Sequence, residues 1–297
     1  MANPISGQGR AARRLGAVEG FLRGLGIDTH AVVTRKAGDA REAASGVADG
    51  LILSFGGDGT FNEVLNGADL ERCVLGVLPA GTGNVLAKEL GLLDNPISAV
   101  GQLAEGGLAH LDLGVCNGRR FISMCGAGAD AYIVREVHKN RRRHLTKLHY
   151  LGPVFQQSLR PIQWGIRVTV DGQLFAQDAN AVCVGNTRSY GGPVVMTSAA
   201  SPIDGAFDVI VMRIGDITDM CAPALGLVLG SLHACPDVRY TRGRSIELSS
   251  ARDDVLWQVD GEAAGNLPVE IVCQPARVKM VVPRSFDPRP KGYAGDP

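Results

Sequence analysis

An apolar run that ends in a glycine turn, at residues 51–63, constrains the fold most strongly. Residues 51–55 have the apolar character of a buried parallel strand, and Gly56-Gly57-Asp58-Gly59 follows directly. A helix is expected next, because Thr60 and Glu63 have the spacing of a capping box. A strand, a glycine turn and a helix N-terminus in this order favour phosphate binding, since glycines admit an anion and the helix end adds positive potential.

The acid within this turn needs a separate explanation, because a carboxylate repels a phosphate. Asp58 would hold a magnesium ion, fix another cation or take a proton from an attacking hydroxyl. A tight strand-to-helix turn without a ligand remains the alternative, since short glycine motifs are weak signals.

Strand and helix patterns alternate through residues 1–113, which predicts an α/β domain with a parallel, doubly wound sheet. A second apolar strand at 74–78 leads into another glycine loop at 79–84, and ligands bind beyond the carboxyl ends of such strands. Only Met1 and Ala2 precede the Asn3-Pro4 turn, so either the first strand is very short or the true start lies upstream. The other expected elements are a strand at 29–34 and helices at 10–26, 39–47, 85–90 and 97–104.

After residue 113, short apolar segments separated by turns indicate a mainly β, sandwich-like domain over 114–284. Asp171-Gly172 predicts a hairpin turn, and a strand at 278–282 can return to either domain. Residues 285–297 are proline-rich and are expected to form a loose tail. The strand candidates lie at 121–125, 165–170, 179–185, 207–213, 245–249, 256–259 and 269–273.

Charge and cysteine usage exclude several classes of protein. The formal net charge is +0, so no global field recruits nucleic acid. The 7 cysteines form no CxxC pair, which argues against a zinc site or a disulfide framework and favours a cytoplasmic location. The start of the chain does not resemble a signal peptide, and the apolar stretch at 220–232 is too short to cross a bilayer.

A series of short motifs resembles the bacterial diacylglycerol kinase-like lipid kinases, which are related to sphingosine and ceramide kinases. Each motif is weak alone, but their order and spacing are specific, and the resemblance covers nearly the whole chain. The motifs are Asn3-Pro-Ile-Ser-Gly7, Thr34 with Gly38-Asp-Ala40, Gly56-Gly-Asp-Gly-Thr60 with Asn62-Glu63, Pro79-Ala-Gly-Thr-Gly-Asn84, Asp112-Leu-Gly114, Gly126-Ala-Gly-Ala-Asp130, Gly191-Gly192, Asp204-Gly205 and Asp260-Gly-Glu262.

The resemblance implies an active site in a cleft between the two domains and transfer of the γ-phosphoryl group of ATP, with Mg²⁺, to a lipid hydroxyl. A diacylglycerol-like acceptor is expected first, with a sphingoid base or another lipid as alternatives. The residues implied in the ATP site are Asn3, Pro4, Ser6, Gly7, Thr34, Gly57, Asp58, Gly59, Thr60, Asn62, Glu63, Gly81, Thr82 and Asn84.

Four acids are implied in the chemistry. Glu262 is the first choice for the general base, with Asp260 as its partner, although Asp-Gly more often marks a plain hairpin turn. Asp58 is the rival base, as proposed for the sphingosine-kinase branch. Asp112 would support Asp58 through a shared cation or water.

A structural magnesium ion is implied in the loop of Asp204, with the carboxylate of Asp204 and backbone oxygens of Ser201 and Ala206 as ligands. An ordinary Asp-Gly turn is the alternative. The basic stretch at 138–149 is either a contact with anionic headgroups or a solvated helix face. The expected partner is a lipid at the membrane surface, with peripheral membrane contact and no nucleic acid; a homodimer is one option.

Three positions depart from the bacterial pattern, and at one of them Ser198 stands in place of the proline that is usual before the Asp204 loop. Gln8 stands where a lysine is common, so Arg10 or Arg13 would have to supply the charge, and Val85 stands where an aspartate is common. These departures leave two alternatives to the lipid kinase. One is a NAD kinase-like phosphotransferase, which shares Gly-Gly-Asp-Gly, and the other is a non-catalytic nucleotide- or lipid-binding protein.

Overall fold

The computed structural model describes residues 1–139, 163–190, 194–213, 232 and 235–289, which form two compact units. The first unit comprises Met1–Leu113 and Pro275–Arg289, and the second comprises Gly114–Gln274. The elements within the first unit are α1 (Ser6–Gly24), α2 (Asp39–Ser45), β1 (Gly50–Gly56), α3 (Asp58–Gly67), β2 (Cys73–Pro79), α4 (Val85–Glu89) and α5 (Pro96–Ala104).

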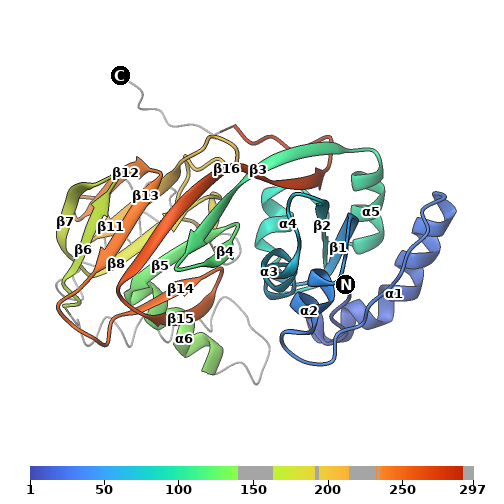
Figure 1. The fold of residues 1–297 in the computed structure, drawn as a ribbon, viewed down its shortest axis with the longest axis horizontal. Helices are drawn as coiled ribbons and strands as arrows, with labels where there is room; N and C mark the ends of the chain where they lie inside the picture. Colours follow the sequence, from blue (N-terminus) through green and yellow to red (C-terminus); the bar gives the residue numbers. More distant parts are fainter. Residues whose placement is uncertain (140–162, 191–193, 214–231, 233–234, 290–297) are drawn as a thin grey trace. The chain divides into compact units, whose positions relative to one another are not determined.

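The first unit is a parallel α/β layer structure, as predicted. Strand β1 pairs in parallel with β2, and Ala2 makes single parallel bridges to Phe55 and to Val33. Helices α1 and α5 pack together on one side of these strands, and α2 and α3 pack together on the other (Figure 1). The prediction of a strand at 29–34 is wrong. Only Val33 makes a β-bridge, because the strand that would pair with this segment is reduced to Ala2.

Two strands carry the chain between the units. Strand β3 (Gly107–Cys116) leaves the first unit, and β16 (Val269–Val282) returns to it. The beginning of β16 pairs with β13 (Ser245–Ser249), whereas Met280 near its end pairs in parallel with Leu75 of β2. The strand predicted at 278–282 therefore belongs with the first unit, although the predicted second domain extended to residue 284.

The second unit consists mainly of antiparallel strands. One sheet has the strand order β12-β11-β8-β5-β14-β15, and β13, β6 and β7 continue from β16 in the other. The elements are β4 (Arg119–Phe121), β5 (Met124–Gly128), α6 (Ala129–Lys139), β6 (Ile166–Val170), β7 (Gln173–Ala179), β8 (Ala181–Gly185), β9 (Ser189–Tyr190), β10 (Val194–Val195), β11 (Phe207–Met212), β12 (Val238–Gly243), β13 (Ser245–Ser249), β14 (Leu256–Val259) and β15 (Glu262–Asn266).

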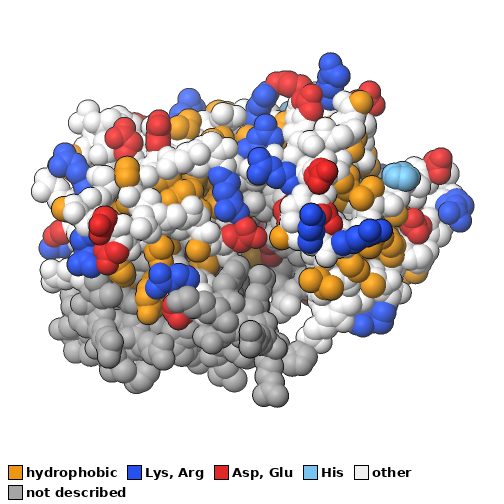
Figure 2. Space-filling model, turned by 60° about the horizontal axis from the view of Figure 1, so that its bottom comes forward, with side chains coloured by type: hydrophobic (Ala, Val, Ile, Leu, Met, Phe, Trp, Pro, Cys, Tyr) orange, Lys and Arg blue, Asp and Glu red, His pale blue; other side chains and the backbone are white. Residues whose placement is uncertain are grey.

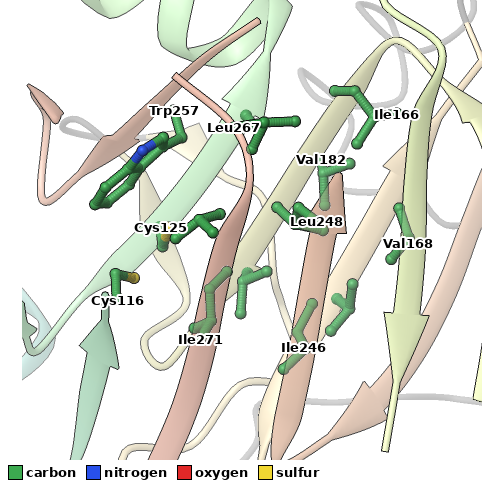
Figure 3. Packing of buried hydrophobic residues seen from close by; sticks show 14 of the residues in the cluster. Cys116, Cys125, Ile166, Val168, Val182, Ile246, Leu248, Trp257, Leu267 and Ile271 are labelled. Carbon is green, nitrogen blue, oxygen red and sulfur yellow. The ribbon is translucent and has the colours of Figure 1, made fainter. Parts of the chain in front are cut away.

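A hydrophobic core between the two sheets confirms the sandwich. Cys125, Val182 and Trp257 of one sheet pack with Val168 and Ile271 of the other (Figure 3). Burying each such large apolar side chain contributes about 1.5–3 kcal/mol to folding. The core thus fixes the strands whose ends carry the polar residues described below.

Two local predictions in the second unit have different outcomes. Asp171-Gly172 forms the expected hairpin turn, with φ angles of 47° and 77°, between β6 and β7. The single strand expected at 121–125 is instead split into β4 and β5. The split occurs because the N–H groups of Ile122 and Ser123 bond to a side chain rather than to a neighbouring strand.

On the face drawn in Figure 2, positive and negative side chains are interspersed over the described residues. No helix in the described part of the chain has the length and apolar character needed to cross a membrane. Most of the basic stretch at 138–149, the Gly191-Gly192 motif and the tail from residue 290 lie outside the described residues.

Candidate active site

Three loops of the first unit converge, and glycines permit the approach. A Cβ atom on Gly7 would lie 1.9 Å from the carbonyl oxygen of Ala80, and one on Gly81 would lie 2.6 Å from the Cα of Gly57. Asn3 Nδ2 donates a hydrogen bond of 3.1 Å to Thr60 Oγ1. The structure therefore brings together the predicted Asn3–Gly7 motif and both glycine loops, because only residues without a Cβ allow backbones to meet so closely.

A polar pocket of about 280 Å³ lies beside this convergence. Gly7, Gln8 and Gly9 all have positive φ angles, of 55°, 61° and 80°, so the chain makes a left-handed turn before regular α1 begins. The guanidinium of Arg13 donates a hydrogen bond of 3.0 Å to the carbonyl oxygen of Gln8. The lining residues are Gly7, Gln8, Arg10, Arg13, Gly81, Thr82, Asn84 and Asp94.

The lining of this pocket has features that favour an anion, although it also includes the acid Asp94. Glycines admit an anion close to the backbone, and the two arginines that the sequence offered in place of lysine both line it. Asn84 is almost fully buried, and its Nδ2 donates to the carbonyl oxygen of Gly81 at 3.1 Å. The second glycine loop is therefore held in shape by its own asparagine.

Asp58 is the first residue of α3 and is half-buried. Its Oδ1 accepts a hydrogen bond of 3.3 Å from the N–H of Leu86, at the start of α4, where Asn84 provides no side-chain cap. Burial raises the pKa of Asp58, and the hydrogen bonds from Leu86 and Val85 oppose that rise. The carboxylate thus links the first glycine loop to the helix that follows the second.

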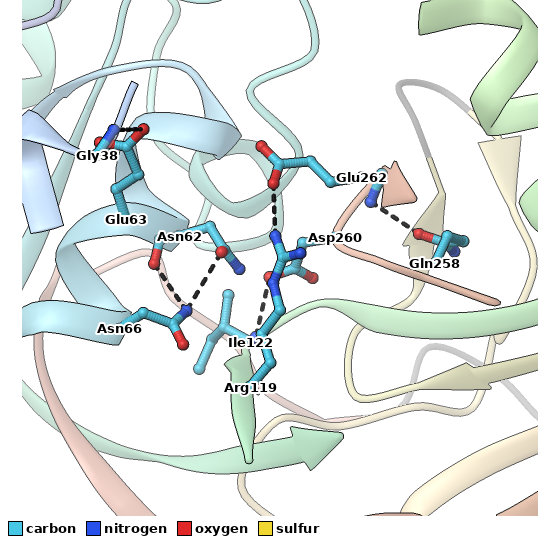
Figure 4. A network of polar contacts seen from close by, with 10 residues as sticks. Gly38, Asn62, Glu63, Asn66, Arg119, Ile122, Gln258, Asp260 and Glu262 are labelled. Carbon is cyan, nitrogen blue, oxygen red and sulfur yellow. Dashed lines mark hydrogen bonds and ion pairs between the residues drawn. The ribbon is translucent and has the colours of Figure 1, made fainter. Parts of the chain in front are cut away.

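The capping box expected at Thr60 and Glu63 is wrong. Helix α3 has Gly57 as its N-cap and no side-chain cap, and the carboxylate of Glu63 points to another helix. It accepts from the N–H groups of Gly38 and Ala40, at 3.0 and 3.1 Å, at the N-terminus of α2 (Figure 4). Glu63 therefore joins α3 to α2, which the spacing within one helix cannot reveal.

The remaining residues predicted for the nucleotide site lie near these loops. The N–H of Thr34 donates to the carbonyl oxygen of Ala2 at 2.9 Å. The backbone carbonyl and side-chain oxygens of Asn62 both accept from Asn66. Pro4 and Ser6 belong to the turn that opens α1, and Gly59 lies in the first turn of α3.

Asp112 lies on β3 and is buried. Its Oδ1 accepts a hydrogen bond of 2.7 Å from the N–H of Ala276, whose φ is 52°. Asp112 thus fixes β16 where the chain returns to the first unit. The support for Asp58 that the resemblance implies remains a prediction.

In the second unit, Asp260 and Gly261 form the two-residue turn between β14 and β15, with φ angles of 46° and 80°. The carboxylate of Asp260 accepts hydrogen bonds of 3.2, 3.0 and 3.0 Å from the N–H groups of Ile122, Ser123 and Met124. The hairpin interpretation is therefore right about conformation. The carboxylate anchors the turn to the segment between β4 and β5.

Glu262 begins β15 directly after this turn. Its carboxylate forms an ion pair with Arg119 of β4, and 41% of the Glu262 side chain and 31% of the Arg119 side chain are exposed (Figure 4). Sequence reasoning missed Arg119 because it lies 143 residues earlier, in no recognisable motif. Glu262 is thus an accessible carboxylate held by one guanidinium.

In the loop predicted to hold magnesium, both carboxylate oxygens of Asp204 have protein partners, and the magnesium site remains a prediction. One oxygen of Asp204 accepts from the N–H of Ala206 at 3.2 Å, and the other pairs with the guanidinium of Arg242. In the described part of the chain, no three His, Cys, Asp or Glu side chains are grouped to hold a metal. Arg242 therefore supplies positive charge at this loop, and Ser201 is buried.

Comparison with known proteins agrees with this architecture. A solved structure from Bacillus anthracis strain Sterne matches with a TM-score of 0.80 at 24% identity, covering 96% of this chain and 94% of that one. Another, titled as a diacylglycerol kinase from the same strain, matches with a TM-score of 0.70 at 22% identity, covering 96% of both chains. At these identities the similarity establishes the fold alone.

Sequence comparison establishes the family. The model of the diacylglycerol kinase catalytic domain matches residues 1–116, and that of the YegS C-terminal NAD kinase beta sandwich-like domain matches residues 123–282. The diacylglycerol kinase of Bacillus subtilis strain 168 is 31% identical over 95% of both chains. That of Mycobacterium tuberculosis H37Rv is 30% identical over 96% of this chain and 94% of its own. The chain therefore belongs to the diacylglycerol kinase family of ATP-dependent lipid kinases.

Proposed function

We propose that this lipid kinase transfers the γ-phosphoryl group of Mg²⁺-bound ATP to a hydroxyl group of a diacylglycerol-like lipid. The convergence of three glycine-containing loops beside a pocket with two arginines carries the proposal. Phosphoryl transfer mostly requires positioning and charge neutralisation, and these loops supply both. The diacylglycerol acceptor is taken from the names of the relatives.

The first unit would bind the nucleotide. Backbone N–H groups around Gly57 and Gly81 would contact the phosphates, while Arg10 and Arg13 provide the charge that Gln8 lacks. Mg²⁺, when bound, would neutralise phosphate charge, and the carboxylate of Asp58 is the candidate ligand in this unit.

The second unit would provide the proton acceptor. Glu262 is the candidate because its carboxylate is accessible, whereas Asp260 already holds three N–H groups. A general base must reach the hydroxyl whose proton it removes, and an anchored carboxylate moves only if its hydrogen bonds break. Asp58 remains the rival base.

The acceptor places the enzyme at a lipid surface. A lipid substrate remains in a bilayer, so the proposal includes peripheral contact with the membrane. A sphingoid base is the alternative lipid acceptor, and NAD is the alternative soluble one. A homodimer is compatible with the proposal but is not required by it.

The test is transfer of radiolabelled γ-phosphate from ATP with Mg²⁺ to detergent-dispersed lipids. The panel contains diacylglycerol, monoacylglycerol, phosphatidylglycerol, sphingosine and ceramide, with NAD as the soluble control. Label in diacylglycerol is the expected result. Label in sphingosine or ceramide would identify that lipid as the acceptor in place of diacylglycerol. Label only in NAD, or binding of ATP with no transfer to any acceptor, would overturn the proposal.

A further inference from the structure

A buried chain of hydrogen bonds leads to the turn before Glu262. Tyr190 donates its hydroxyl hydrogen to Oδ1 of Asp130, and Gln258 Nε2 donates to Oδ2 of Asp130 at 2.8 Å. The other end of the Gln258 carboxamide, Oε1, accepts from the N–H of Gly261 at 2.9 Å (Figure 4). One side chain thus connects a buried acid to the backbone of the Asp260-Gly261 turn.

The residues around this chain of hydrogen bonds bury it and leave space for it. Gln258 is fully buried on β14 and lies opposite Gly126 of β5, while Asp130 lies in the first turn of α6 with 6% of its surface exposed. A Cβ atom on Gly126 would lie 1.8 Å from Oδ2 of Asp130. The glycine therefore leaves the space in which the acid and the carboxamide meet.

We propose that Asp130 is a positioning residue for Glu262 and acts through Gln258. The inference rests on the proposed role of Glu262 as the base. An ionised carboxylate only accepts hydrogen bonds, so Asp130 obliges Gln258 to present its amide nitrogen. The carboxamide oxygen then accepts from the N–H of Gly261, and the turn has a second contact besides the anchor that Asp260 provides.

Breaking this chain of hydrogen bonds should cost folding free energy, because the side chains that form it are buried. A buried donor or acceptor left without a partner loses its hydrogen bonds to water as well as to protein. Replacing Asp130 by an apolar residue would free Gln258 to rotate, and the N–H of Gly261 would lose its fixed acceptor. Glu262, the next residue, would then adopt several orientations instead of one.

Amide hydrogen exchange of Gly261, measured by NMR on the full chain, tests the link without using activity. In Asp130→Leu and in Gln258→Met, we expect the Gly261 amide to exchange about tenfold faster, the effect of losing one hydrogen bond. The amides of Ser123 and Met124, which Asp260 binds, serve as internal references and should keep their protection. Unchanged exchange of Gly261 in both variants would overturn the inference.

The conservative variant is the matched control. Asp130→Asn keeps an oxygen for Gln258 Nε2 and offers an amide group to the Tyr190 hydroxyl, so the protection of Gly261 should be retained. Tyr190→Phe should also retain it, because it removes only the bond at the far end of the chain. If Asp130→Asn exposes Gly261 as much as Asp130→Leu does, Asp130 does not act by orienting Gln258.

Phosphotransfer kinetics then test the consequence for Glu262. Gln258→Met should lower kcat about tenfold with the KM for ATP unchanged, and should have no further effect in a Glu262→Gln background. If the two substitutions lower kcat by separate factors that multiply in the double variant, Gln258 does not act through Glu262. If Glu262→Gln alone retains full activity, the assignment of the base fails and the catalytic part of this inference with it, whereas the Gly261 exchange still reports on the structural link.

Discussion

The glycine loops of the first unit and the Asp260-Gly261 turn of the second unit both place an acid in a tight turn beside a strand, but they use it differently. In the first unit, loop backbones meet each other directly at Gly7 and Gly81. In the second unit, a carboxylate binds three backbone N–H groups and no such close approach of glycines is involved. Identical residue types therefore produce closely packed loop backbones in one place and a hydrogen-bonded anchor in the other.

Because the two regions are held together differently, they should be sensitive to different kinds of substitution. A surface made by close backbone approach fails when any side-chain atom is added, because the backbone has no space to yield. An anchor made by hydrogen bonds fails when its acceptor is removed, because the donors become unsatisfied. Substitutions of each kind therefore test whether the two regions have the roles assigned to them.

Gly7→Ala should have the largest effect. Its Cβ would lie 1.9 Å from the carbonyl oxygen of Ala80, and Gly7 also has a φ of 55°. We expect ATP affinity, measured by calorimetry, to fall by more than about 100-fold, equivalent to about 2.7 kcal/mol or more. Gly20→Ala, at an exposed position of α1 with open space around it, is the control and should leave binding unchanged. Unimpaired ATP binding by Gly7→Ala would show that the loops do not form the nucleotide site.

Asp260→Asn should destabilise the second unit by about 3 kcal/mol, because hydrogen bonds to a charged group contribute about 1.5–3 kcal/mol each and the new amide faces N–H donors. Urea denaturation followed by tryptophan fluorescence measures the change. Asp254→Asn, which removes an exposed acid paired with Arg252, should not move the transition. Full stability of Asp260→Asn combined with complete loss of phosphotransfer would instead identify Asp260 as the base.

Burial raises the pKa of Asp130 to about 6 from its ordinary value of 3.8. The folded state therefore binds the proton more tightly, so this contribution to stability is present below pH 3.8 and is lost as the pH rises through 6. The difference corresponds to about 3 kcal/mol, at about 1.4 kcal/mol per pKa unit. Denaturation midpoints between pH 4 and 7 should fall in the wild type and fall less steeply in Asp130→Asn.

The groups near Asp130 do not account for the expected difference in pH dependence between the wild type and Asp130→Asn. Tyr190 donates to Asp130, and burial raises the pKa values of the Cys125 and Cys183 thiols well above their ordinary value, so both thiols remain neutral in this range. Asp208, whose pKa burial also raises to about 6, contributes a slope of the same sign that the variant keeps. Identical slopes in the two proteins would refute the role of Asp130 in the dependence.

Arg119→Gln should have a smaller effect. The ion pair with Glu262 is partly exposed, so stability should change little, whereas phosphotransfer should fall about tenfold because Glu262 loses the group that orients it. Arg119→Lys should recover part of the rate. Arg252→Gln, which removes another arginine from an exposed ion pair of the same unit, is the control. A wild-type rate in Arg119→Gln would show that the pair is only a surface contact.

Local patterns predicted much of the fold because the core strands have continuous or alternating apolar runs. The bounds expected for β13 and β14 match those observed, and β1 and β2 each extend one residue further at both ends. The strand at 29–34 was wrong because its pairing depends on the length of a different segment. The motifs also located the loops that meet at Gly57 and Gly81, since both follow neighbouring parallel strands.

Side-chain partners that are distant in sequence were not predictable. Glu63 binds an N–H group 25 residues earlier rather than capping its own helix, and Glu262 pairs with an arginine 143 residues earlier. Gln258 carried a partial signal, because it lies on β14 only two residues before Asp260 of the turn. Its connection to Asp130 depends on the pairing of β14 with β5, which one sequence does not specify.

The central claim is that Glu262 accepts the proton while Asp260 holds the turn. Its most direct test is the single-turnover rate of phosphate transfer from Mg²⁺-bound ATP to dispersed diacylglycerol by Glu262→Gln, with the melting temperature measured on the same preparation. Loss of a general base predicts a rate about 10²- to 10⁴-fold lower at an unchanged melting temperature. A rate equal to that of the wild type would contradict the claim and leave Asp58 as the candidate base.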